Sequence, residues 1–115
     1  MLELSVACLA IALYGEGSTL DQKIAIGSVI IRSAGSTEKI CDEVYKPHRY
    51  EYIDLMRAGK LEPPSKKELL KNELIALDLI RGKYKLKPYK HFHDNRIKNP
   101  WGFQPKEIIG ALTFY

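Results

Sequence analysis

One glutamate stands where a long apolar run of the sequence ends. Glu16 follows the apolar run 6–14, is flanked by Gly15 and Gly17, and a second predicted helix begins soon after it. A carboxyl group beside apolar surface is poorly hydrated when ionised, so its pKa rises and it can remain protonated near neutral pH. Such a group suits general acid catalysis, and we expect the two glycines to leave room for a substrate. The alternative is an ordinary glutamate that caps a helix or lies in solvent.

A second candidate site is the histidine pair His91 and His93. Their i, i+2 spacing is that of a strand, which places both imidazoles on one face, and Asp94 and Asn95 follow directly. Such a face can grip a sugar or hold a metal. A tetrahedral zinc site needs further ligands, and neither the remaining histidine nor the cysteines lie at a suitable spacing. We therefore predict a substrate-lining role, and no metal or cofactor.

Aromatic and acidic residues elsewhere allow more than one interpretation. The aromatic residues that could either stack on sugar rings or simply pack are Tyr50, Tyr52, Tyr89 and Trp101. A hydrolytic glycosidase of the usual kind also needs a second carboxylate near its acid. The acids that could supply it are Asp21, Asp42, Glu43, Glu51 and Asp54. None stands out by position, and each is expected to be a surface charge.

The elements that must position these residues are mainly helical. Residues 2–14 are apolar on nearly every side, which predicts a central helix. Thr19 and Gln22 fit a capping box that begins a second helix over 20–32, where small residues permit close helix contact. A short helix is predicted over 40–45, and the aromatic segment 50–52 is expected to form an irregular surface.

The second half of the chain begins with a helix and ends in extended structure. Ser65 and Glu68 form another predicted capping box, and this helix ends near Gly82. Its expected apolar stripe is Leu70, Leu74 and Leu77. Segments 89–93 and 111–115 are predicted to be extended around a loop over 95–105. The predicted fold class is α+β, mainly α, as a single domain over residues 1–115.

Composition limits the possible environments and partners. The chain has 115 residues, a formal charge of +4 and two cysteines. The charge favours an anionic partner, but we expect no nucleic-acid partner because acidic residues are interspersed and no known binding motif occurs. The apolar run is too short to span a membrane, and no signal peptide is expected. Cys8 and Cys41 are expected to be reduced and buried, with a single bridge as the alternative.

Several segments in order resemble one family of cell-wall hydrolases, typified by the spore cortex-lytic enzyme SleB. Tyr14-Gly15-Glu16 resembles the family's Tyr-Gly-Glu after an apolar helix, and 22–32 is similar to its Gln-x-Ala-x-Gly-x-Val-x-x-x-Arg helix apart from spacing. Residues 41–47 resemble its Cys-x-x-Val-Tyr-x-Pro, 91–100 its histidine segment before Asn-Pro, and 114–115 its closing Phe-Tyr. The loop between Glu16 and the second helix is shorter than the family's.

The resemblance implies a lysozyme-like single domain that acts on peptidoglycan glycan strands. It makes Glu16 the counterpart of the catalytic glutamate and gives Tyr50, His91 and His93 a cleft-lining role; Asn95 is added as a substrate-binding candidate. With no obvious second carboxylate, the expected reaction is that of a lytic transglycosylase, with a hydrolytic muramidase or a non-catalytic peptidoglycan-binding module as alternatives. A monomeric phage endolysin, held in the host cytoplasm until its release to the wall, is the expected biological setting.

Overall fold

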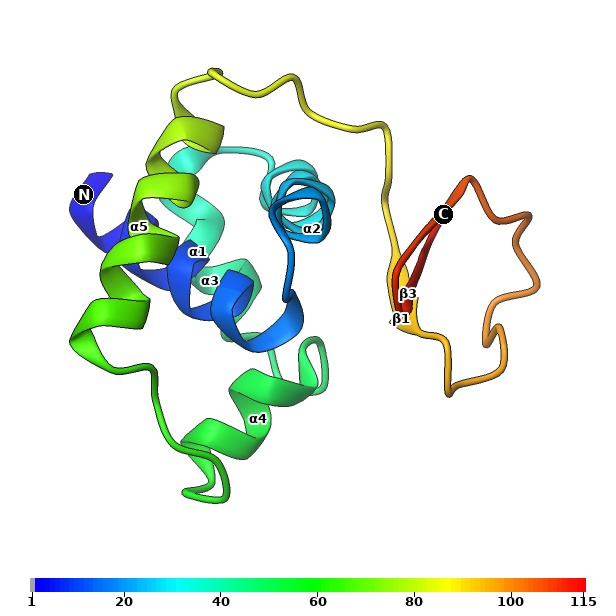
Figure 1. The fold of residues 1–115 in the computed structure, drawn as a ribbon, viewed down its shortest axis with the longest axis horizontal. Coiled ribbons are helices and arrows are strands. Elements are labelled where there is room, and N and C mark those ends of the chain that lie inside the picture. Colours follow the sequence, from blue (N-terminus) through cyan, green and yellow to red (C-terminus); the bar gives the residue numbers. More distant parts are fainter. Residues whose placement is uncertain (1) are drawn as a thin grey trace.

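The computed structural model describes residues 2–115, which form a mainly helical α+β fold (Figure 1). The helices are α1 (Leu2–Glu16), α2 (Leu20–Ala34), the 3-10 helix η1 (Thr37–Lys39), α3 (Ile40–Val44), α4 (Glu51–Arg57) and α5 (Lys66–Ile80). The strands are β1 (Phe92–Asp94), β2 (Glu107–Ile109) and β3 (Leu112–Phe114). Figure 1 shows the helices gathered in one region and the sheet to one side of it. This arrangement confirms the predicted fold class.

Helix α1 is the centre of the helical region, as its apolar composition predicted. It contacts α2, α3, α4 and α5, and Leu9 and Leu13 are fully buried. A helix surrounded on several sides needs apolar side chains around its whole circumference. Helix α1 ends at Glu16, two residues beyond the predicted range, so the candidate acid is the last residue of the most central element.

Helix α2 begins and packs as predicted. Thr19 accepts a hydrogen bond from the backbone N–H of Gln22, and the Gln22 side chain reaches back to the cap, completing the capping box. Gly27 allows α2 to approach α5 closely: a Cβ atom there would lie 2.5 Å from Cδ1 of Leu79. Small residues on α2 therefore set the contact between these two helices.

A disulfide joins α1 to α3, which corrects the expectation of reduced thiols. Cys8 and Cys41 are bonded, with their Cα atoms 5.2 Å apart and a sequence separation of 33. Neither cysteine belongs to a recognisable framework in the sequence, because the pairing depends on how α3 folds back along α1. The observed disulfide is the single bridge that the sequence left as the alternative.

Residues 51–57 form helix α4, where the sequence indicated an irregular surface. The chain turns at His48, whose φ is 64°, passes through the extended Tyr50 and starts the new helix at Glu51. Tyr52 and Ile53 are both buried on α4. Burial against α1 stabilises a helix whose seven residues are too few to show a clear period.

The apolar stripe predicted on α5 is partly wrong. Ser65 caps this helix by accepting a hydrogen bond from the Glu68 backbone, which is one half of the predicted capping box. Leu70 and Leu74, however, are each 59% exposed. The buried residues of α5 are Asn72, Ala76 and Leu79. The face of α5 that packs against α1 and α2 carries these three residues, and the two leucines lie outside it.

The sheet has the strand order β1-β3-β2, and both pairs are antiparallel. The predicted extended segment 89–93 overlaps β1 and the segment 111–115 contains β3; the two strands pair through Phe92 and Phe114. Strand β2 was not predicted, since its three residues are too few to show alternation. The Gln22 side chain donates a hydrogen bond to the Ile109 carbonyl at 3.0 Å, which ties the sheet to the start of α2.

The segment between α5 and β1 crosses α2 before it reaches the sheet (Figure 1). The Lys87 backbone N–H donates to Ser28 Oγ at 2.9 Å, and Arg32 Nε donates to the Lys87 carbonyl at 2.7 Å. These bonds hold β1 on the side of the helical region where α1 ends. No helix within residues 2–115 has the length and apolar character needed to cross a membrane.

Candidate active site

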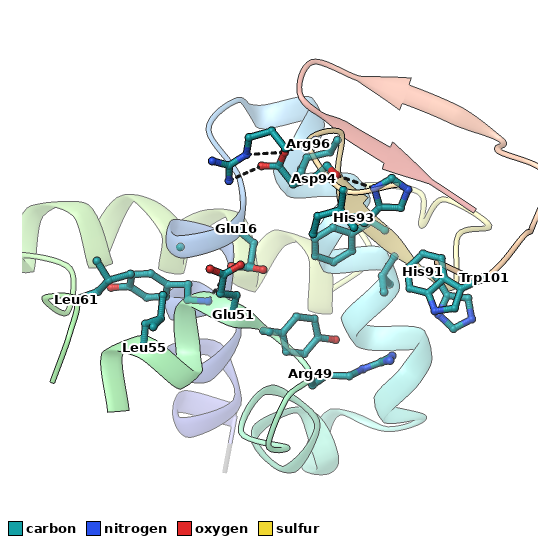
Figure 2. Close-up of a pocket in the computed structure, with 17 residues that line it drawn as sticks. Glu16, Arg49, Glu51, Leu55, Leu61, His91, His93, Asp94, Arg96 and Trp101 are labelled. Atoms are coloured by element: carbon teal, nitrogen blue, oxygen red, sulfur yellow. Dashed lines mark hydrogen bonds and ion pairs between the residues drawn. The ribbon is translucent and has the colours of Figure 1, made fainter. Parts of the chain in front are cut away.

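A cleft of about 380 Å³ lies where the end of α1, the start of α4 and strand β1 meet. Glu16 and Glu51 come from the helical side, and His91 and His93 come from the sheet side (Figure 2). The other side chains used below that line it are Arg49, Tyr50, Tyr52, Leu55, Leu61, Asp94, Arg96 and Trp101. The cleft therefore joins residues from both halves of the chain.

Glu16 has the environment of a general acid. Burial raises its pKa, the hydrogen bond from the Tyr52 backbone N–H to its Oε2 (3.4 Å) lowers it, and the negative charges of Glu51 and Asp54 raise it again. The result is a pKa of about 7, compared with an ordinary 4.5. At neutral pH a large fraction of the Glu16 carboxyl groups is therefore protonated inside an open cleft.

The glycines beside Glu16 do not leave open space for a substrate, contrary to the expectation. A Cβ atom on Gly15 would lie 2.1 Å from ring atoms of Tyr52, and one on Gly17 would lie 2.9 Å from Cδ1 of Ile26. The Tyr52 ring occupies the space over Gly15 and meets Tyr14 edge to face at 5.8 Å. The glycines act by letting α4 and α2 approach the end of α1 closely.

Glu51 is a second carboxylate in the same cleft. It is the first residue of α4, is exposed, and its side chain points toward that of Glu16 in Figure 2. Asp94 also lines the cleft, but both of its oxygens bind Arg96, at 3.0 Å from Nε and 3.1 Å from Nη2. Asp54 accepts a hydrogen bond from the His48 backbone N–H at 3.1 Å. The sequence did not distinguish Glu51 from these other acids.

Glu43 is a buried ion-pair partner and not the expected surface charge. Its side chain is 2% exposed and accepts hydrogen bonds from Arg49 Nε and from the Tyr50 hydroxyl, both at 2.7 Å. Burial opposes its ionisation, but the bonds from Arg49 and Tyr50 outweigh burial, so its pKa is lowered. Asp21 and Asp42 are exposed, as predicted.

Tyr50 lines the cleft with its ring while its hydroxyl is bound elsewhere. The residue is 3% exposed, and its ring stacks on Phe92 with centroids 6.3 Å apart. Because the hydroxyl donates to Glu43, what Tyr50 presents to the cleft is an aromatic wall. Tyr89 is also buried and packs against Phe114, so its role is in the core. Tyr52 packs over Gly15 and donates its hydroxyl proton to the Glu62 carbonyl.

The two histidines both line the cleft but have different surroundings. His93 Nδ1 lies 2.8 Å from the Asp94 carbonyl, which can only accept, so this nitrogen donates; Nε2 then accepts from the Tyr115 hydroxyl at 2.6 Å. Its ring is thus held by the protein on both sides. Burial, together with the positive charges of Arg49 and Lys90, lowers the pKa of His91, which favours a neutral ring at pH 7.

Asn95 is not among the residues that line the cleft. Its Oδ1 accepts a hydrogen bond from Thr113, its Nδ2 donates to the Gly110 carbonyl at 3.3 Å, and its backbone N–H donates to the Ala111 carbonyl at 2.8 Å. These bonds fasten the loop after β1 to the β2–β3 turn. The structure therefore brings Glu16, Tyr50, His91 and His93 together and places Asn95 in a supporting position.

Arg49 and Arg96 are cleft residues that the sequence did not single out. Both lie in irregular segments, where no periodicity indicates which way a side chain points.

Across residues 2–115, no three histidine, cysteine, aspartate or glutamate side chains are grouped so that they could hold a metal ion. Comparison of the chain with protein-family models, with curated proteins and with solved structures gave no match.

Proposed function

We propose that this protein cleaves the glycan strands of peptidoglycan at the β-1,4 bond between N-acetylmuramic acid and N-acetylglucosamine, in a lysozyme-like arrangement. The observation that carries the proposal is the half-buried Glu16 with a pKa of about 7 in an open cleft. Cleaving a glycosidic bond requires a protonated acid at the leaving oxygen, and a carboxyl group with a raised pKa supplies one near neutral pH. The resemblance of 14–16 to the family's Tyr-Gly-Glu names the same residue.

In the first step Glu16 donates its proton to the glycosidic oxygen as the C1–O bond of the muramyl unit breaks. Positive charge develops at the muramyl C1 and ring oxygen. The Glu16 carboxylate that remains lies beside this charge and stabilises it. The leaving strand carries the transferred proton as a new 4-hydroxyl group on N-acetylglucosamine.

The second step distinguishes two reactions. In a lytic transglycosylase, the Glu16 carboxylate takes the proton of the muramyl 6-hydroxyl as that oxygen attacks C1, which closes a 1,6-anhydro ring and restores the acid. This route needs one carboxyl group, and it is the reaction we propose first. The resemblance to cell-wall hydrolases, in a sequence with no obvious second acid, favours the same reaction.

A hydrolytic muramidase is the second candidate, and Glu51 is the specific observation that favours it. A retaining or inverting hydrolase uses a second carboxylate that either attacks C1 or activates a water molecule. Glu51 lines the cleft and points toward Glu16 (Figure 2), while Asp94 is paired with Arg96. In this reaction the product would carry a reducing muramyl end.

The disulfide is relevant to the place of action. Disulfides persist in oxidising surroundings such as the periplasm and the cell exterior, and they are rare in the cytosol. The Cys8–Cys41 bond therefore favours a protein that works outside the cytosol, where peptidoglycan lies. A phage endolysin that matures after its release fits this proposal.

The test is mass spectrometry of the soluble products from purified peptidoglycan treated with wild type, Glu16→Gln and Glu51→Gln. We expect anhydromuramyl products from wild type and from Glu51→Gln, and none from Glu16→Gln. Reducing muramyl ends that disappear in Glu51→Gln would replace the transglycosylase with a hydrolase. Unchanged release by Glu16→Gln would refute the role of Glu16, and binding to the wall without release by wild type would favour a non-catalytic module.

A further inference from the structure

The loop between β1 and β2 exposes two large aromatic side chains beside the cleft. Trp101 is 40% exposed and Phe103 is 47% exposed. Trp101 lines the same cleft as Glu16. A large aromatic ring that stays exposed at the edge of a cleft does not gain the stabilisation that burial would give. Such a ring is therefore a candidate contact for a ligand.

The rings of Trp101 and Phe103 contact each other and the ring of His91, and these contacts hold them in place. The His91 ring lies 5.1 Å from Trp101 and 5.5 Å from Phe103, and the planes of Trp101 and Phe103 are inclined by only 17° at a centroid distance of 6.0 Å. Tyr115 meets Trp101 edge to face at 5.3 Å. We call His91, Trp101 and Phe103 the aromatic platform.

The Asn99 side chain holds the backbone that carries Trp101 and Phe103. Asn99 Oδ1 accepts hydrogen bonds from the backbone N–H groups of Trp101 (3.1 Å) and Gly102 (3.0 Å), and its Nδ2 donates to the Phe103 carbonyl at 2.8 Å. Gly102 has a φ of 71°, a conformation that glycine adopts without strain. The rings are thus positioned before any ligand arrives, which reduces the entropy lost on binding.

Two residues of the platform, His91 and Trp101, line one end of the cleft. In Figure 2, Trp101 and His91 lie on one side, Leu55 and Leu61 lie on the other, and the carboxyl groups of Glu16 and Glu51 lie between them. A linear polymer laid along the cleft would therefore contact the platform with a unit that is not the one being cleaved.

The charges in the cleft favour a sugar over a nucleobase as the stacked group. The two arginines that line the cleft are paired with carboxylates, Arg96 with Asp94 and Arg49 with Glu43. A nucleic acid would bring its phosphates next to the exposed carboxylate of Glu51. A pyranose ring has an apolar face of C–H groups for the platform and carries no charge. The neutral His91 ring at the platform's edge can exchange a hydrogen bond with a hydroxyl or an N-acetyl group.

We propose that His91, Trp101 and Phe103 form a saccharide subsite, which stacks a pyranose ring of an N-acetylated glycan strand at a distance from the bond cleaved at Glu16. This proposal rests on the proposed function for the identity of the polymer. It assigns the 95–105 loop a binding role and makes Trp101 a determinant of substrate affinity.

Trp101 is the only tryptophan in the chain, so its fluorescence reports on this subsite alone. We would titrate Glu16→Gln with the N-acetylglucosamine hexamer and, as a control, with the glucose hexamer of the same linkage. We expect a saturable change in tryptophan emission with the first sugar and a much weaker one with the second. By calorimetry, Trp101→Ala should weaken binding about tenfold, whereas Trp101→Phe should stay within about threefold of the parent.

The matched control is Ile108→Ala. Ile108 is 65% exposed on β2 of the same sheet and does not line the cleft, so binding should be unchanged. Far-ultraviolet circular dichroism and the melting temperature identify variants that fail to fold. If Trp101→Ala is one of them, the emission titration of Glu16→Gln with the two hexamers decides the proposal. No emission change up to millimolar hexamer, or equal affinities of the parent and Trp101→Ala, would overturn the subsite.

The outcomes also separate this inference from the proposed function. Saturable binding at Trp101 with no release of peptidoglycan fragments by wild type would support the subsite and remove the catalytic proposal. Release of fragments that depends on Glu16, with KM unchanged in Trp101→Ala, would support catalysis and remove the subsite. The two proposals can therefore fail independently.

Discussion

At the scale of the single residue, the burial that suits Glu16 to general acid catalysis also lowers the stability of the folded protein. Its folded pKa of about 7 lies above the ordinary value of 4.5, because the folded protein disfavours the charged form. Glu16 therefore does not lower the free energy of unfolding below about pH 4.5, and its destabilising effect grows as the pH rises toward 7. The same burial that keeps the acid protonated makes the ionised protein less stable.

This linkage predicts opposite effects of Glu16→Gln on stability and activity. At pH 8 we expect the variant to be more stable to unfolding by about 2 to 3 kcal/mol, a figure reduced for the partial exposure of the carboxyl group. The gain should vanish below pH 4.5. Urea unfolding of both proteins at pH 4 and pH 8 measures it, and Asp21→Asn serves as an exposed control. A gain that is equal at both pH values would show that ionisation is not the cause.

The same pKa sets the pH dependence of peptidoglycan cleavage. The acid must be protonated, so kcat/KM should fall above about pH 7 and approach a tenfold loss per pH unit. Glu51→Gln removes one of the negative charges that raise the Glu16 pKa, and the falling limb should move to lower pH. A limb that stays in place in Glu51→Gln would show that the two carboxyl groups do not interact.

At the scale of the elements, the site depends on how closely α4 approaches the end of α1. Tyr52 packs over Gly15, and its backbone N–H binds Glu16, so one contact sets both the separation of the helices and the position of the acid. A side chain at residue 15 acts directly on this contact. Such a side chain would disturb helix packing and not strain the backbone.

We expect Gly15→Ala to destabilise the protein by about 1 to 3 kcal/mol, because a Cβ atom 2.1 Å from the Tyr52 ring forces the two helices apart. The double variant Gly15→Ala/Tyr52→Ala should cost less than the sum of the two single changes, since it removes the ring atoms at 2.1 Å and leaves only the Tyr52 Cβ contact at 2.7 Å. Thermal unfolding of the four proteins completes the cycle. Strict additivity would mean that the two residues do not contact each other.

At the scale of the whole molecule, the disulfide between α1 and α3 fastens the central helix to its neighbour. It closes a loop with a sequence separation of 33, for which the chain-entropy model gives a stabilisation of about 3 to 4 kcal/mol. A domain of 115 residues has a small total stability, so this bond is a large fraction of it. The oxidised protein should therefore be considerably more robust than the reduced one.

Reduction of the Cys8–Cys41 bond should lower the melting temperature by at least 10 °C, as should Cys8→Ser/Cys41→Ser under oxidising conditions. Differential scanning calorimetry with and without a phosphine reductant measures the effect, and the double serine variant should not respond to the reductant. Two titratable thiols in the air-oxidised, denatured wild-type protein would contradict the pairing itself.

Much of the helical framework could be predicted from local sequence, because its causes are local. The apolar run 6–14 implies a central helix, and Thr19 with Gln22 marks the start of the next one. Glu16 could be identified as a candidate because the end of an apolar helix is where a carboxyl group loses hydration. The predicted stripe on α5 was partly wrong because contacts with α1 and α2, which are distant in sequence, decide which face of α5 is buried.

The rest of the site was decided by tertiary structure alone. Glu51, Arg49 and Trp101 lie in short or irregular segments. The sheet side of the cleft depends on how the segment before β1 is fastened across α2 by the bonds of Lys87 with Ser28 and Arg32. The burial of Glu43 and the pairing of the cysteines depend on the same long-range packing. By itself the sequence determined α1, α2, α3 and α5 and the candidate acid, since hydrophobic periodicity and caps act between near neighbours. The second carboxylate, the aromatic platform and the disulfide required the fold, because contacts between distant segments leave no period in the chain.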